Sequence, residues 1–153
     1  AYDRHAAARP DVVRVGCWAH ARRPFADAQA EDPRAARVAL KLIGRLYRYE
    51  RAWDEVDAAA SRPRDPATRA RLRAAHFARP LRWLHALALA LRARHRPKSG
   101  LGQAAGYLLG QWASLARHVE HGQTQLDNNL VENAVRPTKL GLKNWLFAVS
   151  VAQ

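Results

Sequence analysis

The residues best suited to chemistry lie near the C-terminal end, in the stretch from Leu126 to Pro137. This stretch places Asp127 and Glu132 five positions apart, among side-chain amides and cations. Carboxylates are scarce here, because the only ones after Asp65 are Glu120, Asp127 and Glu132. Mg²⁺ sites in proteins use one or two carboxylates together with water and phosphate oxygens. The pattern suggests a metal-holding carboxylate beside a bound polyanion.

The charge of the chain also points to a polyanionic partner. Lys and Arg number 26 against 13 Asp and Glu, which gives a net charge of +13 and a pI near 11.3. Ten of the cations lie between Pro66 and Val119, a segment without a single carboxylate. Most of the cations are Arg, and one guanidinium can donate two parallel hydrogen bonds to a phosphate, so nucleic acid is the favoured partner. A genomic bias toward Arg and Ala codons is the alternative explanation.

Composition favours one globular domain. The chain has 153 residues, of which 48% are hydrophobic and 25% charged. Cys17 is the single cysteine, so no disulfide can form within the chain, as expected in a reducing cytosol. No apolar run reaches the roughly 18 residues of a membrane span, and we expect no signal peptide. Because position 1 is not Met, we expect the chain to begin inside a longer protein.

The elements that position these residues are mostly helices. Apolar residues at spacings of three and four predict helices from Pro33 to about Ala60, from Ala67 to Ala78, from Pro80, and from Leu101 to Val119. Prolines break the pattern near residue 63, Ser99 is suited to cap the last of these helices, and Gly122 should end it. The predicted common core contains Leu46, Trp53, Leu84, Leu108, Trp112 and Leu115.

Shorter elements flank this helical region. Residues 12–18 form the best strand candidate, followed by a helix with Pro24 in its first turn. Asp127 or Asn128 can cap a helix that runs to about Arg136. On that helix Glu132 and Arg136 are four residues apart, so a weak surface ion pair is the alternative to a metal-binding role for Glu132.

Two segments carry a family resemblance. One runs from Gly16 to Phe25, and the other combines Leu126 to Pro137 with Gly141 to Phe147. In this order and spacing they resemble the insertion-sequence-sixty-six transposase family of bacterial mobile elements. The similarity extends over nearly the whole chain.

The resemblance implies a fold and an activity. Such transposases are DDE enzymes with an RNase H-like catalytic domain, which cut and join DNA strands with two divalent metals. We therefore expect a mainly α (α+β) fold. It would be a truncated RNase H-like domain with a helical insertion at about 33–120 and at most a few short strands. Residues 1–153 would form the C-terminal part of the catalytic domain.

The resemblance also assigns roles to residues. Glu132 matches the final catalytic and metal-binding Glu, with Mg²⁺ or Mn²⁺ as cofactor. The two catalytic Asp residues would lie upstream of Ala1, so the chain alone should be inactive. Asn133 and Leu142 stand where the family usually has Arg, as expected in a decayed copy. The predicted nucleic-acid contacts are Arg22, Arg23, Asn128, Arg136, Lys139 and Lys143.

Partners and location follow from the same resemblance. The expected partner is DNA, both the element ends and the target, with a homo-oligomer in the transposition complex, no membrane contact and a bacterial cytoplasmic location. The alternative function is a non-catalytic helical DNA-binding module or a remnant of a decayed mobile element.

Overall fold

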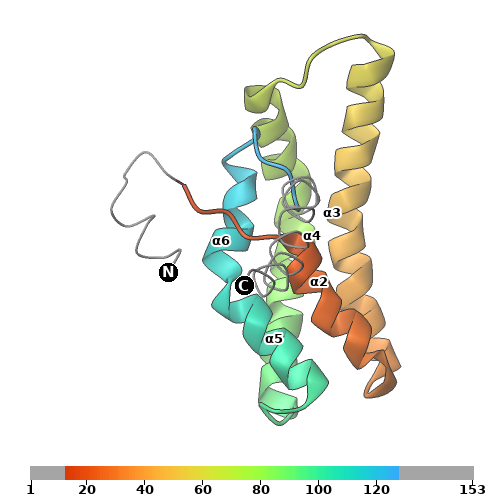
Figure 1. The fold of residues 1–153 in the computed structure, drawn as a ribbon, viewed down its shortest axis with the longest axis vertical. Helices are drawn as coiled ribbons and strands as arrows, with labels where there is room; N and C mark the ends of the chain where they lie inside the picture. The colour runs from red at the N-terminus through yellow and green to blue at the C-terminus, as the bar shows by residue number, and fades with distance from the viewer. Residues whose placement is uncertain (1–12, 128–153) are drawn as a thin grey trace, which may run out of the picture.

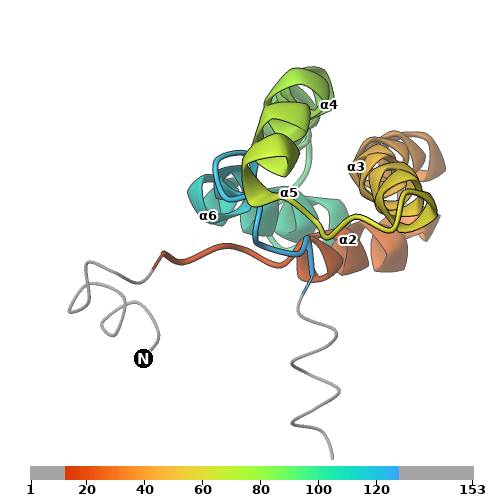
Figure 2. The same cartoon turned by 90° about the horizontal axis from the view of Figure 1, so that it is seen from above.

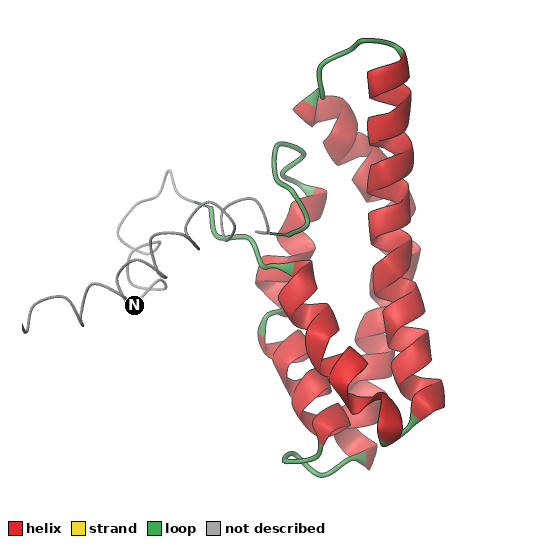
Figure 3. Cartoon of the chain, turned by 45° about the vertical axis from the view of Figure 1, so that its right-hand side comes forward, coloured by secondary structure: helices red, strands yellow, loops and turns green. Residues whose placement is uncertain are grey.

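The fold is a bundle of helices, seen in a computed structural model that describes residues 13–127 (Figure 1). No strand occurs within these residues (Figure 3). The α-helices are α2 (Trp18–Asp27), α3 (Pro33–Ala59), α4 (Pro66–Arg94), α5 (Gly100–Gly110) and α6 (Trp112–Ala116). Short 3-10 turns follow α2 and α6, at Ala28–Ala30 and Arg117–Val119. The predicted mainly helical fold is thus confirmed for the described part of the chain.

Side-chain caps determine where the longer helices begin. The Asp32 carboxylate accepts hydrogen bonds from the Arg34 and Ala35 amides at 3.0 and 2.9 Å, and α3 begins at the next residue, Pro33. Asp65 accepts from the Thr68 amide at 2.8 Å in the same way, ahead of α4. The Ser99 hydroxyl accepts from the Gly102 amide at 3.1 Å, which confirms the predicted cap of α5.

Proline positions account for two wrong boundaries. Residues 66–94 form one helix that contains Pro80, where two helices were predicted. An interior proline removes one helical hydrogen bond at a cost of about 3 kcal/mol. Here Phe77, Leu81 and Leu84 are buried on either side of Pro80, and this burial offsets the loss. Pro24 likewise lies inside α2, not in its first turn.

The predicted helix over 101–119 is divided. Helix α5 ends at Gly110, Gln111 leaves helical geometry, and α6 follows as one short helix. Glycine is a weak helix former, so its position fits the break. Because α6 already ends at Ala116 and passes into a 3-10 turn, Gly122 does not end this helix.

The strand predicted at residues 12–18 is also wrong. Residues 13–17 are extended without strand pairing, and α2 begins at Trp18. Val13 is 45% exposed. No strand among residues 13–127 lies beside this segment, so its β-branched residues have no strand to pair with. Single backbone hydrogen bonds hold the segment, including one from the Gly16 amide to the Ser114 carbonyl at 2.8 Å.

One apolar core connects the helices. Helices α3 and α4 lie side by side, and α2 and α5 both cover the same side of this pair (Figure 2). Of the predicted core residues, Leu46, Leu84, Leu108 and Leu115 are fully buried, whereas Trp53 and Trp112 are half-buried against them. The core prediction is therefore confirmed, with the two tryptophans at its edge. An RNase H-like sheet lies beyond what residues 13–127 can test.

Candidate functional site

The two segments that carry the family resemblance meet at the N-terminus of α2. The Trp18 amide donates a hydrogen bond to the Leu126 carbonyl at 2.8 Å. Close to this bond, the His118 imidazole donates from Nε2 to the Gly16 carbonyl at 2.6 Å. Residues about one hundred positions apart in the sequence thus lie side by side, close to the end of the described chain at Asp127.

Two glycines allow close backbone packing near this meeting point. A Cβ atom on Gly16 would lie 2.8 Å from Leu115 Cδ2 and 3.1 Å from the Leu115 amide nitrogen. A Cβ atom on Gly122 would lie 1.9 Å from the Pro66 carbonyl oxygen at the start of α4. Contacts that short are not possible, so the close backbone approach at both positions requires glycine.

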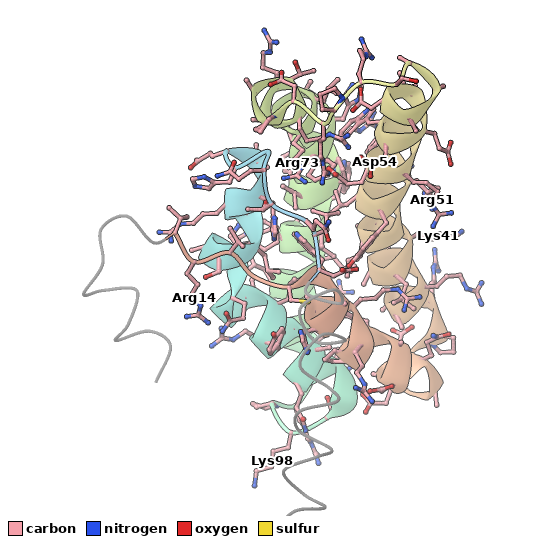
Figure 4. The ribbon with its side chains drawn as sticks, turned by 45° about the horizontal axis from the view of Figure 1, so that its top comes forward. Arg14, Lys41, Arg51, Asp54, Arg73 and Lys98 are labelled. Atoms are coloured by element: carbon pink, nitrogen blue, oxygen red, sulfur yellow. The ribbon has the colours of Figure 1, made fainter. Side chains whose placement is uncertain are left out.

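A cluster of ion pairs, here called the Glu50 cluster, connects α3 to α4. Its members are Glu50, Asp54 and Asp57 on α3, Arg69 and Arg73 on α4, and Arg64 in the loop between them. Figure 4 shows Arg73 and Asp54 between the two helices. Three carboxylates face these three guanidinium groups, and the exposed Arg62 of the same loop adds a fourth cation that pairs with Asp57 at 3.3 Å.

Glu50 is the centre of the cluster. Its Oε1 accepts from Arg73 Nε at 2.7 Å, and its Oε2 accepts from Arg73 Nη2 at 3.1 Å and from Arg69 Nη1 at 3.2 Å. Arg64 forms a further ion pair with the same oxygen. Arg69 and Arg73 are 1% and 0% exposed, so both cations depend on these carboxylates for charge compensation.

Arg73 also holds the segment that leads to Asp127. Its Nη1 donates to the carbonyls of His118 and His121, each at 2.9 Å, and its Nη2 donates to the Thr124 carbonyl at 2.7 Å. The backbone of this segment is thereby tied to α4 at three carbonyls. One buried side chain, itself held by Glu50, therefore ties residues 118–124 to α4.

A cleft of about 240 Å³ opens where the described chain ends. It is lined by Tyr47, Glu50, Asp54, Arg64, Gln125, Leu126 and Asp127. The Tyr47 hydroxyl is buried and has no hydrogen-bond partner among the described residues. Burial, aided by the negative charge of Asp127, raises the pKa of this phenol well above its usual value. Tyr47 therefore stays protonated and offers a hydrogen-bond donor beside Asp127.

Comparison with known proteins identifies the family. The model of the Transposase IS66 family, the insertion-sequence-sixty-six family, matches residues 1–153. The chain belongs to the IS66 transposase family. The resemblance found in the sequence is thus confirmed over the whole chain.

Two relatives of this IS66 family member come from Sinorhizobium fredii. One, described as uncharacterized protein y4qI, is 35% identical over 140 residues, covering 91% of this chain and 24% of the relative. The other, uncharacterized protein y4jD, is 29% identical over 137 residues, covering 88% of this chain and 25% of the relative. The chain thus spans about a quarter of the length of these relatives. No solved structure matches it.

The structure places two of the predicted site residues of this transposase-family chain. Arg22 and Arg23 lie on α2 with exposed side chains, one turn after the backbone contact between Trp18 and Leu126. Glu132 and the other predicted contacts, Asn128, Arg136, Lys139 and Lys143, lie outside the described residues. Within residues 13–127, no helix is both long and apolar enough to cross a membrane.

The described residues do not fit a metal ion. Among residues 13–127 there is no group of three or more His, Cys, Asp or Glu side chains placed to hold one. The acids that do lie together, Glu50, Asp54 and Asp57, are paired with Arg69 and its neighbours.

The Glu50 cluster changes the argument drawn from the ten cations between Pro66 and Val119. Arg69 and Arg73 are buried ion-pair partners, so eight of the ten have exposed side chains. The cluster was not predicted from the sequence, although the sequence contains a signal for it. Glu50, Asp54 and Asp57 recur at helical spacing on α3, and Arg69 and Arg73 are four residues apart on α4.

His118 gives the fold a pH dependence. Burial lowers the pKa of its imidazole, the hydrogen bond to Gly16 opposes this shift, and the nearby Arg73 charge lowers the pKa further. The native state therefore favours neutral His118, while the unfolded chain gains a proton near pH 6.5. This stabilisation is present above pH 6.5 and is lost as the pH falls toward the lower native pKa.

We expect the free energy of unfolding to decrease from pH 7.5 to 5.5, and His118→Gln to weaken this dependence. Gln can still donate from Nε2 to the Gly16 carbonyl but does not titrate in this range. Urea unfolding at both pH values measures the effect. An unchanged difference between the two pH values in the variant would assign the dependence to other groups.

Proposed function

We propose that this chain is the C-terminal part of the catalytic domain of a DDE transposase, which cleaves and joins DNA strands during transposition of an insertion sequence. Glu132 is its metal-binding acid, acting with Mg²⁺ or Mn²⁺ and two Asp residues supplied from outside the chain. The sheet of the RNase H-like domain comes from outside residues 13–127. The helices from about 33 to 120 form an insertion in that domain.

The observation that carries this proposal is the meeting of the two motif segments. The hydrogen bond between the Trp18 amide and the Leu126 carbonyl joins the start of α2, the helix that carries Arg22 and Arg23, to Leu126, and this contact supports a role for both arginines in the proposed site. Phosphate contacts near the reacting acids fix the register of the DNA, while metal-bound carboxylates carry the chemistry. Family membership over residues 1–153 supports the same assignment.

The strand-transfer assay with element-end DNA and Mg²⁺ or Mn²⁺ tests this function. We expect no activity from residues 1–153, because Glu132 is one of three acids in the proposed site and Mg²⁺ needs several oxygen ligands. A longer protein that supplies the two upstream Asp residues should be active. Strand transfer by residues 1–153 alone would contradict the proposed division of the site.

DNA binding is expected to be independent of sequence and to weaken steeply with salt. Arg22→Gln combined with Arg23→Gln should reduce the slope of log affinity against log salt by about two, one for each phosphate that the variant no longer neutralises. Arg51→Gln is the matched control, since Arg51 points outward from α3 (Figure 4). Titration of a duplex at several salt concentrations gives the slopes. Equal slopes for the two variants would show that Arg22 and Arg23 do not contact the DNA phosphates.

The alternative is a non-catalytic helical DNA-binding module from a decayed element. The exclusively helical described region and the paired state of its clustered acids favour it. The same assay separates the two functions. A longer natural protein that binds element-end DNA but never joins strands would support the module.

A further inference from the structure

An apolar groove lies between α3 and α4. It has a volume of about 500 Å³ and is lined by Val38, Leu42, Arg45, Arg79, Trp83, Ala86, Leu87 and Ala90. Six of these eight residues are apolar, and two are unusually exposed for their size, Val38 at 42% and Trp83 at 57%. An exposed tryptophan among aliphatic side chains is typical of a surface that binds another polypeptide.

The arrangement of the bundle leaves this groove open. Helices α2 and α5 cover one side of the α3–α4 pair, and no element of residues 13–127 covers the other (Figure 2). The paired helices present two ridges with an apolar floor between them. An amphipathic helix fits such a groove, because its apolar stripe can contact both ridges at once.

The edges of the groove are cationic. Arg45 and Arg79 lie at opposite ridges, one on α3 and one on α4. The first part of α3, from Pro33 to Tyr49, contains five cations and no carboxylate: Arg34, Arg37, Lys41, Arg45 and Arg48. All five are exposed, and Figure 4 shows Lys41 directed away from the bundle. A partner helix with acidic residues beside its apolar stripe would therefore match both the apolar floor and the cationic edges of the groove.

We propose that the α3–α4 groove is a docking site for an acidic amphipathic helix of a partner polypeptide. Trp83 and Val38 contact its apolar stripe, and Arg45 and Arg79 pair with carboxylates on its two flanks. This inference concerns the side of the α3–α4 pair that α2 and α5 leave open, and it does not depend on the proposed catalytic function.

Other occupants fit less well. A second copy of this chain packed through the same groove would bring its Arg45 and Arg79 against those of the first copy, with no carboxylate in the lining to compensate. Residues 128–153 contain three cations, Arg136, Lys139 and Lys143, and the single carboxylate Glu132, so their charge is also unfavourable. Duplex DNA would satisfy the arginines, but its phosphates gain nothing from an apolar floor.

Binding of designed peptides to the full chain tests the proposal. The probe is a labelled 20-residue helical peptide with a Leu and Phe stripe flanked by Glu. The reference peptide has the same stripe with Lys in place of Glu. We expect the acidic peptide to bind at least about tenfold more tightly than the Lys peptide at moderate salt, from charge complementarity. Equal affinities would overturn the proposal.

Variants locate the binding surface. Trp83→Ala should weaken binding of the acidic peptide by about tenfold or more, as for a central aromatic anchor. Leu89→Ala is the matched control, because Leu89 is an apolar residue of α4 that is 51% exposed but does not line the groove. It should change the affinity less than about twofold. Equal effects of the two substitutions would place the peptide elsewhere and overturn the proposal.

Two further measurements exclude the competing occupants. A 20-base-pair duplex should bind the wild type and Trp83→Ala with equal affinity, because Trp83 is expected to contact a partner helix and not DNA. Sedimentation should give the same mass for both proteins. Loss of DNA affinity in Trp83→Ala would reassign the groove to nucleic acid, and loss of a wild-type dimer would reassign it to self-association; either result overturns the proposal.

Discussion

Glu50→Gln is expected to lower the free energy of unfolding by about 3–5 kcal/mol, the cost of leaving a buried cation without its counterion. Glu50 accepts hydrogen bonds from Arg69 and Arg73, whose guanidinium groups are almost completely buried. Gln has nearly the same size, so the helix and the packing stay, and the negative charge is lost. Arg73 would keep its backbone acceptors but not its charge partner.

Urea or thermal unfolding measures this loss, with Glu55→Gln as the control. Glu55 lies on the same helix and is exposed, so its substitution should change the free energy of unfolding by less than about 0.5 kcal/mol. If both variants were equally stable, the Glu50 cluster would contribute nothing net. Near-ultraviolet circular dichroism would also report looser packing of Trp53, because the Arg69 Cζ atom lies 5.4 Å from the centroid of its ring.

The sequence predicted most of the helical framework because local signals and burial agree there. In α3 the capping Asp32, the first-turn Pro33 and the stripe containing Ala39, Ile43 and Leu46 all indicate the same helix. The same agreement places the start of α5 after Ser99. Where several independent preferences coincide, no tertiary information is needed to position the element.

The boundaries that failed are those where tertiary contacts override local preference. Pro80 signals a helix start in isolation, but burial on both sides of it sustains one continuous α4. Residues 12–18 have strand-forming side chains, and a strand still requires a partner that residues 13–127 do not supply. The secondary-structure propensity of the residues shows neither the burial around Pro80 nor the missing partner strand.

The candidate site was predictable only in part. Its two motif segments were recognised from residue types, while their contact between Trp18 and Leu126 depends on the whole bundle. The role of Arg73 as the side chain that holds residues 118–124 also depends on tertiary structure, since its acceptors are 45 to 51 residues away in the sequence. Charge counting treated Arg73 as one of ten cations between Pro66 and Val119 that favour a nucleic-acid partner, whereas its side chain is buried and paired.

Glu132→Gln in a longer protein that supplies the two upstream Asp residues should abolish strand transfer while leaving DNA affinity within about twofold, since one carboxylate contributes little to phosphate binding. Glu132 lies outside the described residues, and the expectation rests on the proposed transposase function. Gln keeps the length of the side chain and its helix propensity, but it lacks the charge that holds a divalent metal. Two-metal phosphoryl transfer depends on that charge, so the loss should appear in the chemical step.

Glu120→Gln is the control for this substitution, because Glu120 is an exposed carboxylate that precedes Asp127 and Glu132 in the sequence. It should join strands at the parent rate. The assay compares the parent and both variants on element-end DNA with Mg²⁺ or Mn²⁺, with binding measured on the same duplex. Because binding and joining are measured together, a variant that fails to fold would lose both. Strand transfer at the parent rate by Glu132→Gln would show that another residue supplies the final acid, and the role assigned to Glu132 would be wrong.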